Sequence, residues 1–202
     1  MTEDDAQPFK GYDKMVQVVG KRHATCWFDN YETPNDEDVA FRKHALSEAI
    51  RYAKALKTEQ RSGRNIIFAG SCGTGKDHLA VSVLRAALSY NMGAKYIRGS
   101  VLCSECRKHS LEHSQDVPYA MWNVDLLVIS DIEPHAEKPA TEFERRALLE
   151  LIDRRYTAML PTVVTTNKNT KPELVESIGE RVVDRLYEGA VIVPMIWPSY
   201  RG

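Results

Sequence analysis

Residues 70–77 read GSCGTGKD, and this stretch decides the fold. It matches the pattern G-x-x-x-x-G-K, which closes here on Gly75 and Lys76. A short apolar run at 65–69 precedes it, and a run with helical periodicity at 76–90 follows it. A glycine-rich turn between a strand and a helix is the setting that a phosphate-binding loop requires. We therefore predict such a loop and, with it, an α/β fold.

The residue types in this loop suit the phosphates of a nucleotide. Glycines let the backbone approach a ligand closely, and successive N–H groups form a concavity that binds anions. The N-terminus of the following helix adds positive potential, and the lysine supplies a mobile charge for the outer phosphates. The predicted nucleotide-binding residues are Gly70, Ser71, Cys72, Gly73, Thr74, Gly75, Lys76, Asp77 and His78. For His78, contact with phosphate and contact with its helix neighbours alone both stay open.

Two positions depart from the usual pattern of such sites. The residue after the lysine is normally a Ser or Thr that ligates Mg²⁺, and here it is Asp77. The apolar strand at 125–129 is normally followed by two acids, and here Ser130 and Asp131 follow it. We predict that Asp77, Ser130 and Asp131 form the metal site, with Asp77 and Ser130 having exchanged the carboxylate and the hydroxyl. The alternative is a decayed site that binds nucleotide without efficient hydrolysis, so ATPase activity stays undecided.

Strands and helices alternate along the rest of the chain. This alternation predicts a parallel sheet with helices on both faces. The Thr141–Glu144 pair predicts a capping box at the start of one long helix. Residues 1–35 are polar and predict an irregular N-terminal arm ahead of a core at 36–202. The expected strands are 65–69, 94–98, 125–129, 161–165 and 190–195, and the expected helices are 36–60, 76–90, 101–113, 141–159, 171–177 and 179–188.

Composition limits the functional classes. The chain has 202 residues, a formal net charge of −1 and four cysteines. No apolar run approaches the roughly 18 residues of a membrane span, and no secretory signal precedes the core. We expect a cytoplasmic protein with reduced thiols and no membrane partner. A charge near zero gives nucleic-acid binding no general support, so DNA contact requires a local basic patch.

Five segments occur in a telling order: GTGKDHLA, VDLLVISDIEP, VVTTNKN, GERVVDRL and WPSYR. Together they resemble the DnaC/IstB family of AAA+ ATPases, which comprises bacterial and phage helicase loaders and the ATPase helpers of insertion-sequence transposases. The resemblance covers residues 25–202. It implies a P-loop NTPase of AAA+ type, with a five-stranded parallel sheet flanked by helices and no full C-terminal lid domain.

The resemblance also implies residue roles. Asn167 matches the sensor that orients the attacking water, and Arg185 matches the arginine finger that reaches a neighbouring subunit's ATP, with Arg181 beside it. The expected catalytic set is Lys76, Asp131, Asn167 and Arg185. A solvated arginine pair, with Asp184 and Glu180 as local partners, is the alternative for the two arginines. The implied cofactors are ATP and Mg²⁺, and the implied state is a homo-oligomer built through the trans finger.

The function implied is that of a DNA-replication accessory protein resembling a replicative helicase loader. It would couple ATP binding or hydrolysis to assembly on single-stranded DNA or on a helicase. A transposition helper that recruits a transposase and a non-hydrolysing nucleotide-binding adaptor are the alternatives. Only about 25 residues precede the resemblance. That is too short for the compact helicase-binding domain of family loaders, which weakens the loader interpretation.

Three further groups have both a functional and an ordinary interpretation. The quartet Cys103, Cys106, His109 and His113 has zinc-ligand residue types, but its spacing on one helix favours an ordinary helix. The group Tyr96, Arg98, Arg107 and Lys108 is a candidate surface for single-stranded DNA, against a slightly favoured solvated surface with a core tyrosine. The pair Trp27 and Phe28 either lies near the adenine or packs the arm on the sheet.

Overall fold

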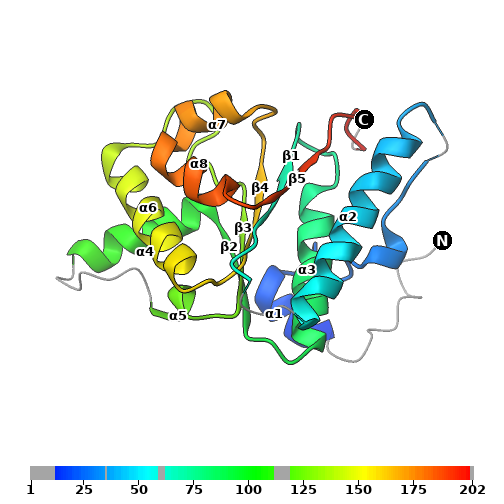
Figure 1. Ribbon diagram of the computed structural model, residues 1–202, viewed down its shortest axis with the longest axis horizontal. Helices are drawn as coiled ribbons and strands as arrows, with labels where there is room; N and C mark the ends of the chain where they lie inside the picture. The colour runs from blue at the N-terminus through cyan, green and yellow to red at the C-terminus, as the bar shows by residue number, and fades with distance from the viewer. Residues whose placement is uncertain (1–11, 35, 59–61, 112–118, 201–202) are drawn as a thin grey trace.

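The computed structural model describes residues 12–34, 36–58, 62–111 and 119–200. Five parallel strands form one sheet in the order β2-β3-β4-β1-β5 (Figure 1). The predicted α/β fold with a five-stranded parallel sheet is confirmed. The strands are β1 (Ile66–Ala69), β2 (Ala94–Arg98), β3 (Leu126–Ser130), β4 (Thr162–Thr166) and β5 (Val191–Pro194).

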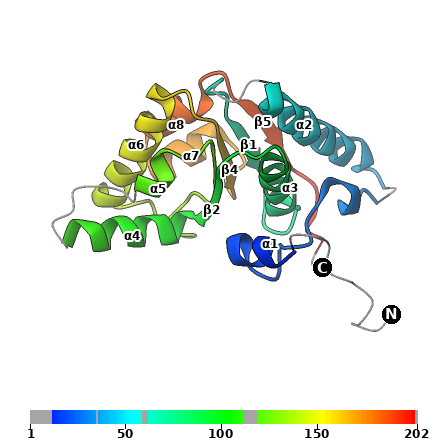
Figure 2. The ribbon, with the colours of Figure 1, turned by 90° about the horizontal axis from the view of Figure 1, so that it is seen from below.

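Helices cover both faces of the sheet (Figure 2). One face carries α1 (Tyr12–Val19), α2 (Val39–Thr58) and α3 (Lys76–Ser89); the other carries α4 (Gly99–Leu111), α5 (Tyr119–Trp122), α6 (Glu142–Thr157), α7 (Lys171–Ile178) and α8 (Glu180–Tyr187). Side chains of a strand alternate between faces, so Ile66 and Phe68 join the core under α2 and α3. Ile67 joins the core under α4, α6 and α8. The strands are therefore buried on both sides, as their continuous apolar runs indicate.

The predicted helices and strands match the observed ones to within a few residues at each end. The elements that the sequence did not predict are short. The capping box of α6 is confirmed, because Thr141 accepts from the Glu144 N–H and Glu144 accepts from the Thr141 N–H. The described part of the arm is not irregular, because α1 and a 3-10 helix, η1 (Phe28–Asn30), lie within it. Met15 and Val19, one helical turn apart, bury that helix against the core. The division at residue 35 stays a prediction.

The strand order places three chain segments side by side at the carboxyl edge of the sheet. Because β4 lies between β1 and β3, the phosphate loop, the end of β4 and the end of β3 meet there. The Gly70 N–H donates to the Thr166 carbonyl oxygen at 3.2 Å and ties the start of the loop to β4. Among the described residues, no helix is long and apolar enough to cross a bilayer.

Arg155 closes the opposite, amino-terminal edge of the sheet. Its side chain is 1% exposed and makes five hydrogen bonds, to the carbonyl oxygens of Met121, Trp122, Val124 and Pro161 and to the Thr162 hydroxyl. Burial lowers the pKa of Arg155 to about 10, so the guanidinium stays charged at neutral pH. One side chain on α6 therefore satisfies backbone groups that precede both β3 and β4.

Candidate functional site

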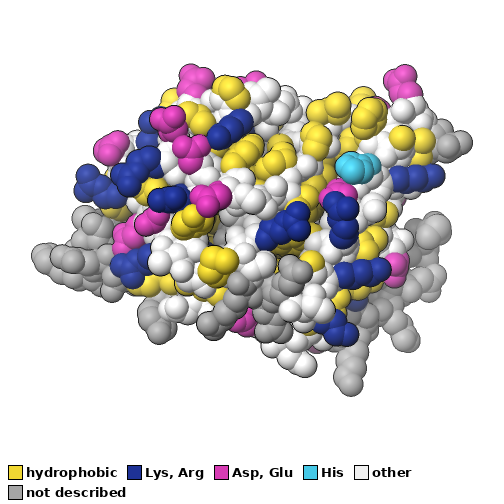
Figure 3. All heavy atoms as spheres, in the orientation of Figure 1, with side chains coloured by type: hydrophobic (Ala, Val, Ile, Leu, Met, Phe, Trp, Pro, Cys, Tyr) yellow, Lys and Arg dark blue, Asp and Glu magenta, His cyan; other side chains and the backbone are white. Residues whose placement is uncertain are grey.

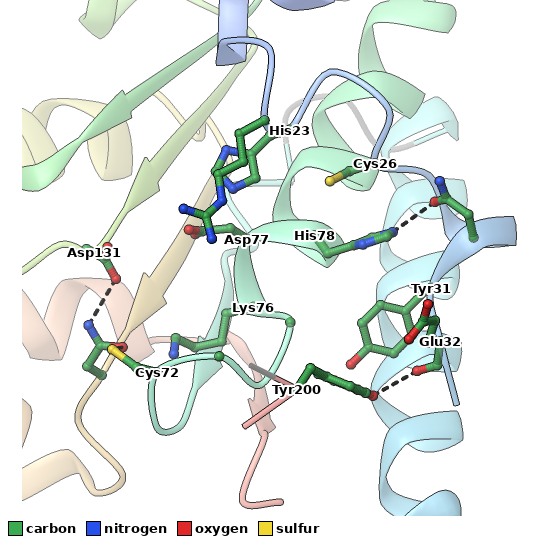
Figure 4. Close-up of a pocket in the computed structure, with 15 residues that line it drawn as sticks. His23, Cys26, Tyr31, Glu32, Cys72, Lys76, Asp77, His78, Asp131 and Tyr200 are labelled. Carbon is green, nitrogen blue, oxygen red and sulfur yellow. Dashed lines mark hydrogen bonds between the residues drawn. The ribbon is translucent and has the colours of Figure 1, made fainter. Parts of the chain in front are cut away.

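A cavity of about 390 Å³ lies at the carboxyl edge of the sheet, over the start of α3 (Figure 4). Four parts of the chain line it: the arm, the phosphate loop with the start of α3, the ends of β3 and β4, and the C-terminal segment after β5. The lining residues are Arg22, His23, Cys26, Asn30, Tyr31, Glu32, Cys72, Gly73, Gly75, Lys76, Asp77, His78, Asp131, Asn167 and Tyr200.

Lys76 opens α3 and is 6% exposed. Its Nζ atom donates to the carbonyl oxygens of Gly70 and Ser71, both at 2.7 Å, so the side chain folds along the loop. Burial lowers the pKa of Lys76, and the negative charges of Asp131 and Asp77 oppose that shift. The ammonium group therefore lies in a cavity that also holds acids, at the positive end of a helix.

Asp77 and Ser130, the two departures from the usual pattern, are hydrogen-bonded to each other. The Ser130 hydroxyl donates to Asp77 Oδ1 at 2.8 Å, and the Thr165 hydroxyl donates to the same oxygen at 3.0 Å. Ser130 ends β3 and is 1% exposed. The fold therefore brings the predicted exchange pair into direct contact from α3 and β3, although the sequence separates them by more than fifty residues.

Asp131 and Asn167 form a second polar pair beside the first. The Asn167 side-chain amide donates to Asp131 Oδ1 at 3.0 Å, and the Asp131 N–H donates to the Thr165 hydroxyl at 2.9 Å. Asp131 has φ of 44°, in the left-handed region that residues other than glycine rarely adopt. Burial raises the pKa of Asp131, and the charge of Asp77 raises it further. Strained backbone beside an acid is characteristic of functional sites.

Glu133 was missed by the sequence analysis and belongs to the same edge. It is 7% exposed, and its Oε1 accepts from the Thr166 hydroxyl and from the Asn167 N–H at 3.2 Å. Its Oε2 has no hydrogen-bond partner in the described structure. Its one signal in the sequence was its position, an acid two residues beyond Asp131. Glu133 therefore fixes the end of β4 and the backbone of Asn167.

Replacing Glu133 with alanine is expected to lower the free energy of unfolding by about 1–3 kcal/mol, because the buried Thr166 hydroxyl and the half-buried Asn167 N–H lose their acceptor. Glu133→Gln keeps one acceptor oxygen and is expected to cost less. Urea unfolding measures both, with Glu137→Ala, an exposed acid in the same loop, as the control. A Glu133→Ala protein as stable as the Glu137→Ala protein would contradict this role.

The arm forms the wall of the cavity that faces β3 and β4. His78 Nε2 lies 2.8 Å from the Trp27 carbonyl oxygen and 3.0 Å from Asn30 Oδ1, so the histidine binds the arm (Figure 4). Burial lowers the pKa of His78, which favours the neutral ring. The side chains of Trp27 and Phe28 pack on each other and on the α3 side of the core, outside the cavity lining. They take the packing role that was one of the two interpretations.

The two predicted finger arginines lie on α8 and do not line this cavity. Arg185 donates to Asp153 Oδ1 at 3.1 Å and stacks 4.7 Å from the centre of the Tyr156 ring. Arg181 is exposed. Figure 3 shows charges of both signs interspersed over the side where α6, α7 and α8 lie. That either arginine reaches the ATP of a neighbouring subunit stays a prediction.

The other candidate groups fit ordinary roles where they are described. Cys103 and Cys106 belong to the core under α4, and burial raises their thiol pKa values to about 12 and about 11. Among the described residues no group of three or more His, Cys, Asp or Glu side chains is placed to hold a metal ion, so this quartet gains no support as a zinc site. His113 lies outside the described residues, as does the His109 side chain. Arg107 pairs with Glu144 at 3.5 Å and Lys108 pairs with Glu105 at 2.7 Å. DNA contact by these basic residues stays a prediction.

Several known proteins are similar to this chain in sequence or in fold. The replicative helicase loader DnaC of Escherichia coli K12 is 31% identical over 183 residues, covering 89% of this chain and 70% of that protein. A crystal structure of the DnaC helicase loader matches 88% of this chain and 99% of its own, with a TM-score of 0.75 and 23% identity. AMPPCP-bound DnaA from Aquifex aeolicus matches 84% of this chain and 50% of its own, with a TM-score of 0.67 and 16% identity. These two structures therefore share the fold of this chain.

A model of one protein family matches residues 25–202, which is most of the chain. The match runs from the arm through the phosphate loop to the segment after β5, so it includes all the residues that line the cavity except Arg22 and His23. The chain belongs to the family of IstB-like ATP binding proteins.

Proposed function

We propose that this chain binds ATP with Mg²⁺ in the cavity and acts as a DNA-replication accessory protein of the helicase-loader type. The observation that carries the proposal is the convergence of Lys76, Asp131 and Asn167, from three separate segments, on one cavity. The sequence relative in Escherichia coli is named a replicative helicase loader, which supports a helicase as partner. We place this activity in the cytoplasm; all four cysteines are unpaired, as expected there.

The residues present fit Mg²⁺. Carboxylate and hydroxyl oxygens are the ligands this ion prefers, and Asp77 and Ser130 supply one of each. Because Ser130 directs its hydrogen to Asp77, its lone pairs remain available to a cation. Few acids are needed, since Mg²⁺ usually takes its other ligands from phosphate and water. When bound, the ion would neutralise charge that develops on the phosphates.

The chain's own side chains would then divide the work. Lys76 leaves the loop carbonyls and contacts the outer phosphates. Asp131 orients the attacking water and accepts its proton, and Asn167 holds both the acid and the water. Arg185 would act on the ATP of a neighbouring copy, for which it has to exchange Asp153 for a phosphoryl group.

Restoring the usual residues at both exchanged positions tests the metal site. Asp77→Thr and Ser130→Asp are each expected to lower ATP turnover about tenfold or more and to raise the Mg²⁺ concentration required. The Asp77→Thr/Ser130→Asp double variant is expected to turn over ATP faster than either single variant, because it again holds one carboxylate and one hydroxyl. A double variant no more active than the worse single variant would sink the exchange hypothesis.

Binding of a replicative helicase tests the loader function. The purified chain is mixed with the hexameric helicase of the same organism, with and without ATP and single-stranded DNA, and complexes are sized by mass photometry. We expect an ATP-dependent complex that Arg185→Ala weakens and that Arg51→Ala, an exposed arginine on α2, does not. Binding to a co-encoded transposase instead selects the transposition helper. ATP bound without turnover above the Lys76→Ala background selects the non-hydrolysing adaptor.

A further inference from the structure

The chain after β5 runs along the phosphate loop; we call residues 195–200 the C-terminal strap. Its first N–H, on Met195, donates to the Ala69 carbonyl oxygen at 2.7 Å, and its last, on Tyr200, donates to the Gly73 carbonyl oxygen at 3.0 Å. Figure 4 shows Tyr200 beside the loop that carries Lys76. The strap is therefore hydrogen-bonded to the chain at both ends of the loop's turn.

The strap and the loop are in contact without space between them. A Cβ atom on Gly70 would lie 2.1 Å from the Met195 carbonyl oxygen, and one on Gly73 would lie 2.0 Å from Ser199 Oγ. Gly73 also has φ of 83°, which favours glycine. Because these two glycines have no side chain, the strap can lie directly against the loop and the loop can make its turn.

Trp197 is the buried centre of the strap. It is 2% exposed, and its indole N–H donates to the Thr74 carbonyl oxygen at 3.0 Å. The Tyr31 hydroxyl donates to the same oxygen over a longer distance, 3.4 Å. On the outer side, the Arg42 guanidinium carbon lies 5.6 Å from the centre of the Trp197 ring and 5.3 Å from that of Tyr200. Arg42 itself is 4% exposed and pairs with Asp36, so α2 holds the strap against the loop.

Anchoring these carbonyl oxygens also orients N–H groups. In a planar trans peptide the C=O of one residue and the N–H of the next point in opposite directions. The Thr74 carbonyl faces Trp197, so the Gly75 N–H points away from the strap. The Gly73 carbonyl faces Tyr200, so the Thr74 N–H does the same. N–H groups of such a loop are the donors that bind phosphate.

We infer that Trp197 is a positioning residue of the nucleotide site, which holds the phosphate loop in its anion-binding shape through the Thr74 carbonyl. This inference rests on the proposed function, because it takes the cavity to be a nucleotide site. Trp197 is not among the residues that line the cavity. Its effect on affinity passes through the orientation of the peptide unit between Thr74 and Gly75.

Two matched tryptophan replacements test the inference. Trp197→Phe keeps an aromatic ring and removes the indole donor. Trp122→Phe is the control, because Trp122 is also buried but its indole nitrogen has no hydrogen-bond partner and it lies near the amino-terminal edge of the sheet. We expect the Kd for ATP, measured by calorimetry, to rise about three- to tenfold in Trp197→Phe. We expect it to stay at the wild-type value in Trp122→Phe, whatever either change does to Tm.

A second measurement retains Trp197. The Trp27→Phe/Trp122→Phe variant leaves Trp197 as the single tryptophan, since the chain has three. We expect saturating ATP to change its emission, and no change when Lys76→Ala is added. Unchanged emission at saturation, a wild-type Kd in Trp197→Phe, or equal weakening in both single replacements would overturn the inference. Failure of the wild-type chain to bind ATP would instead overturn the proposed function.

Discussion

Lys76→Ala is expected to lower ATP turnover by about 100- to 1,000-fold, the loss typical when one preorganised group that stabilises transition-state charge is removed. The ammonium group lies at the helix terminus, within the cavity that also holds Asp77 and Asp131. Its removal leaves those two acids facing the phosphates with less compensation. The charge of Lys76 also lowers the pKa of Asp131, so the variant should protonate that acid at a higher pH.

Single-turnover hydrolysis and ATP calorimetry measure the two consequences separately. Lys168→Ala is the matched control, because Lys168 follows Asn167 at the end of β4 but does not line the cavity. We expect the control to keep wild-type turnover and affinity. Wild-type turnover in Lys76→Ala would show that the loop does not hold the reacting phosphates.

Arg155→Ala is expected to lower the free energy of unfolding by about 3–5 kcal/mol, because it removes the guanidinium donors of four carbonyl oxygens and of the Thr162 hydroxyl. Of these oxygens, that of Pro161 still accepts from the Leu127 N–H. The expected loss is a large share of a normal domain's stability of about 5–15 kcal/mol. Arg155→Met restores volume but no donor and should recover only part of the loss. Such a change acts at the edge of the sheet opposite the nucleotide site, so residual folded protein should keep its affinity for ATP.

Urea unfolding of Arg155→Ala, Arg155→Met and Arg154→Ala separates the buried arginine from its exposed neighbour. Arg154 pairs with Glu150, lies 3.7 Å from the centre of the Trp122 ring and has a side chain that is 49% exposed, so its loss is expected to cost about 1–2 kcal/mol. Similar midpoints for the Arg154 and Arg155 variants would contradict the role of the buried hydrogen-bond cluster.

Local features of the chain were predictable, because the residues that determine each of them lie within a few positions of one another in the sequence. The phosphate loop, its flanking strand and helix, and the cap at Thr141 are of this kind. The metal hypothesis was also accessible, because two departures from one pattern pointed to each other. Their hydrogen bond could only come from the fold, which places β4 and β3 beside the loop.

Features that depend on distant partners were not predictable in the same way. Arg155 lies in a helix rich in charged residues, where a guanidinium usually indicates solvent, and only its acceptors near Trp122 and Pro161 explain its burial. Glu133 lies two residues past Asp131, where the usual acid pattern ends, and its role as an acceptor depends on the end of β4. The arm's polar composition concealed α1, whose stability comes from burying Met15 and Val19 rather than from length.

The pairing of β1 has a consequence for synthesis on the ribosome. The strand before the phosphate loop lies between β4 and β5, and both partners are translated at least ninety residues after it. The strap, which holds the loop carbonyls, comes later still. A nascent chain therefore carries the complete loop sequence long before it has the neighbours that shape it. On this arrangement the loop gains the neighbours that shape it only after β5 and the strap have been translated.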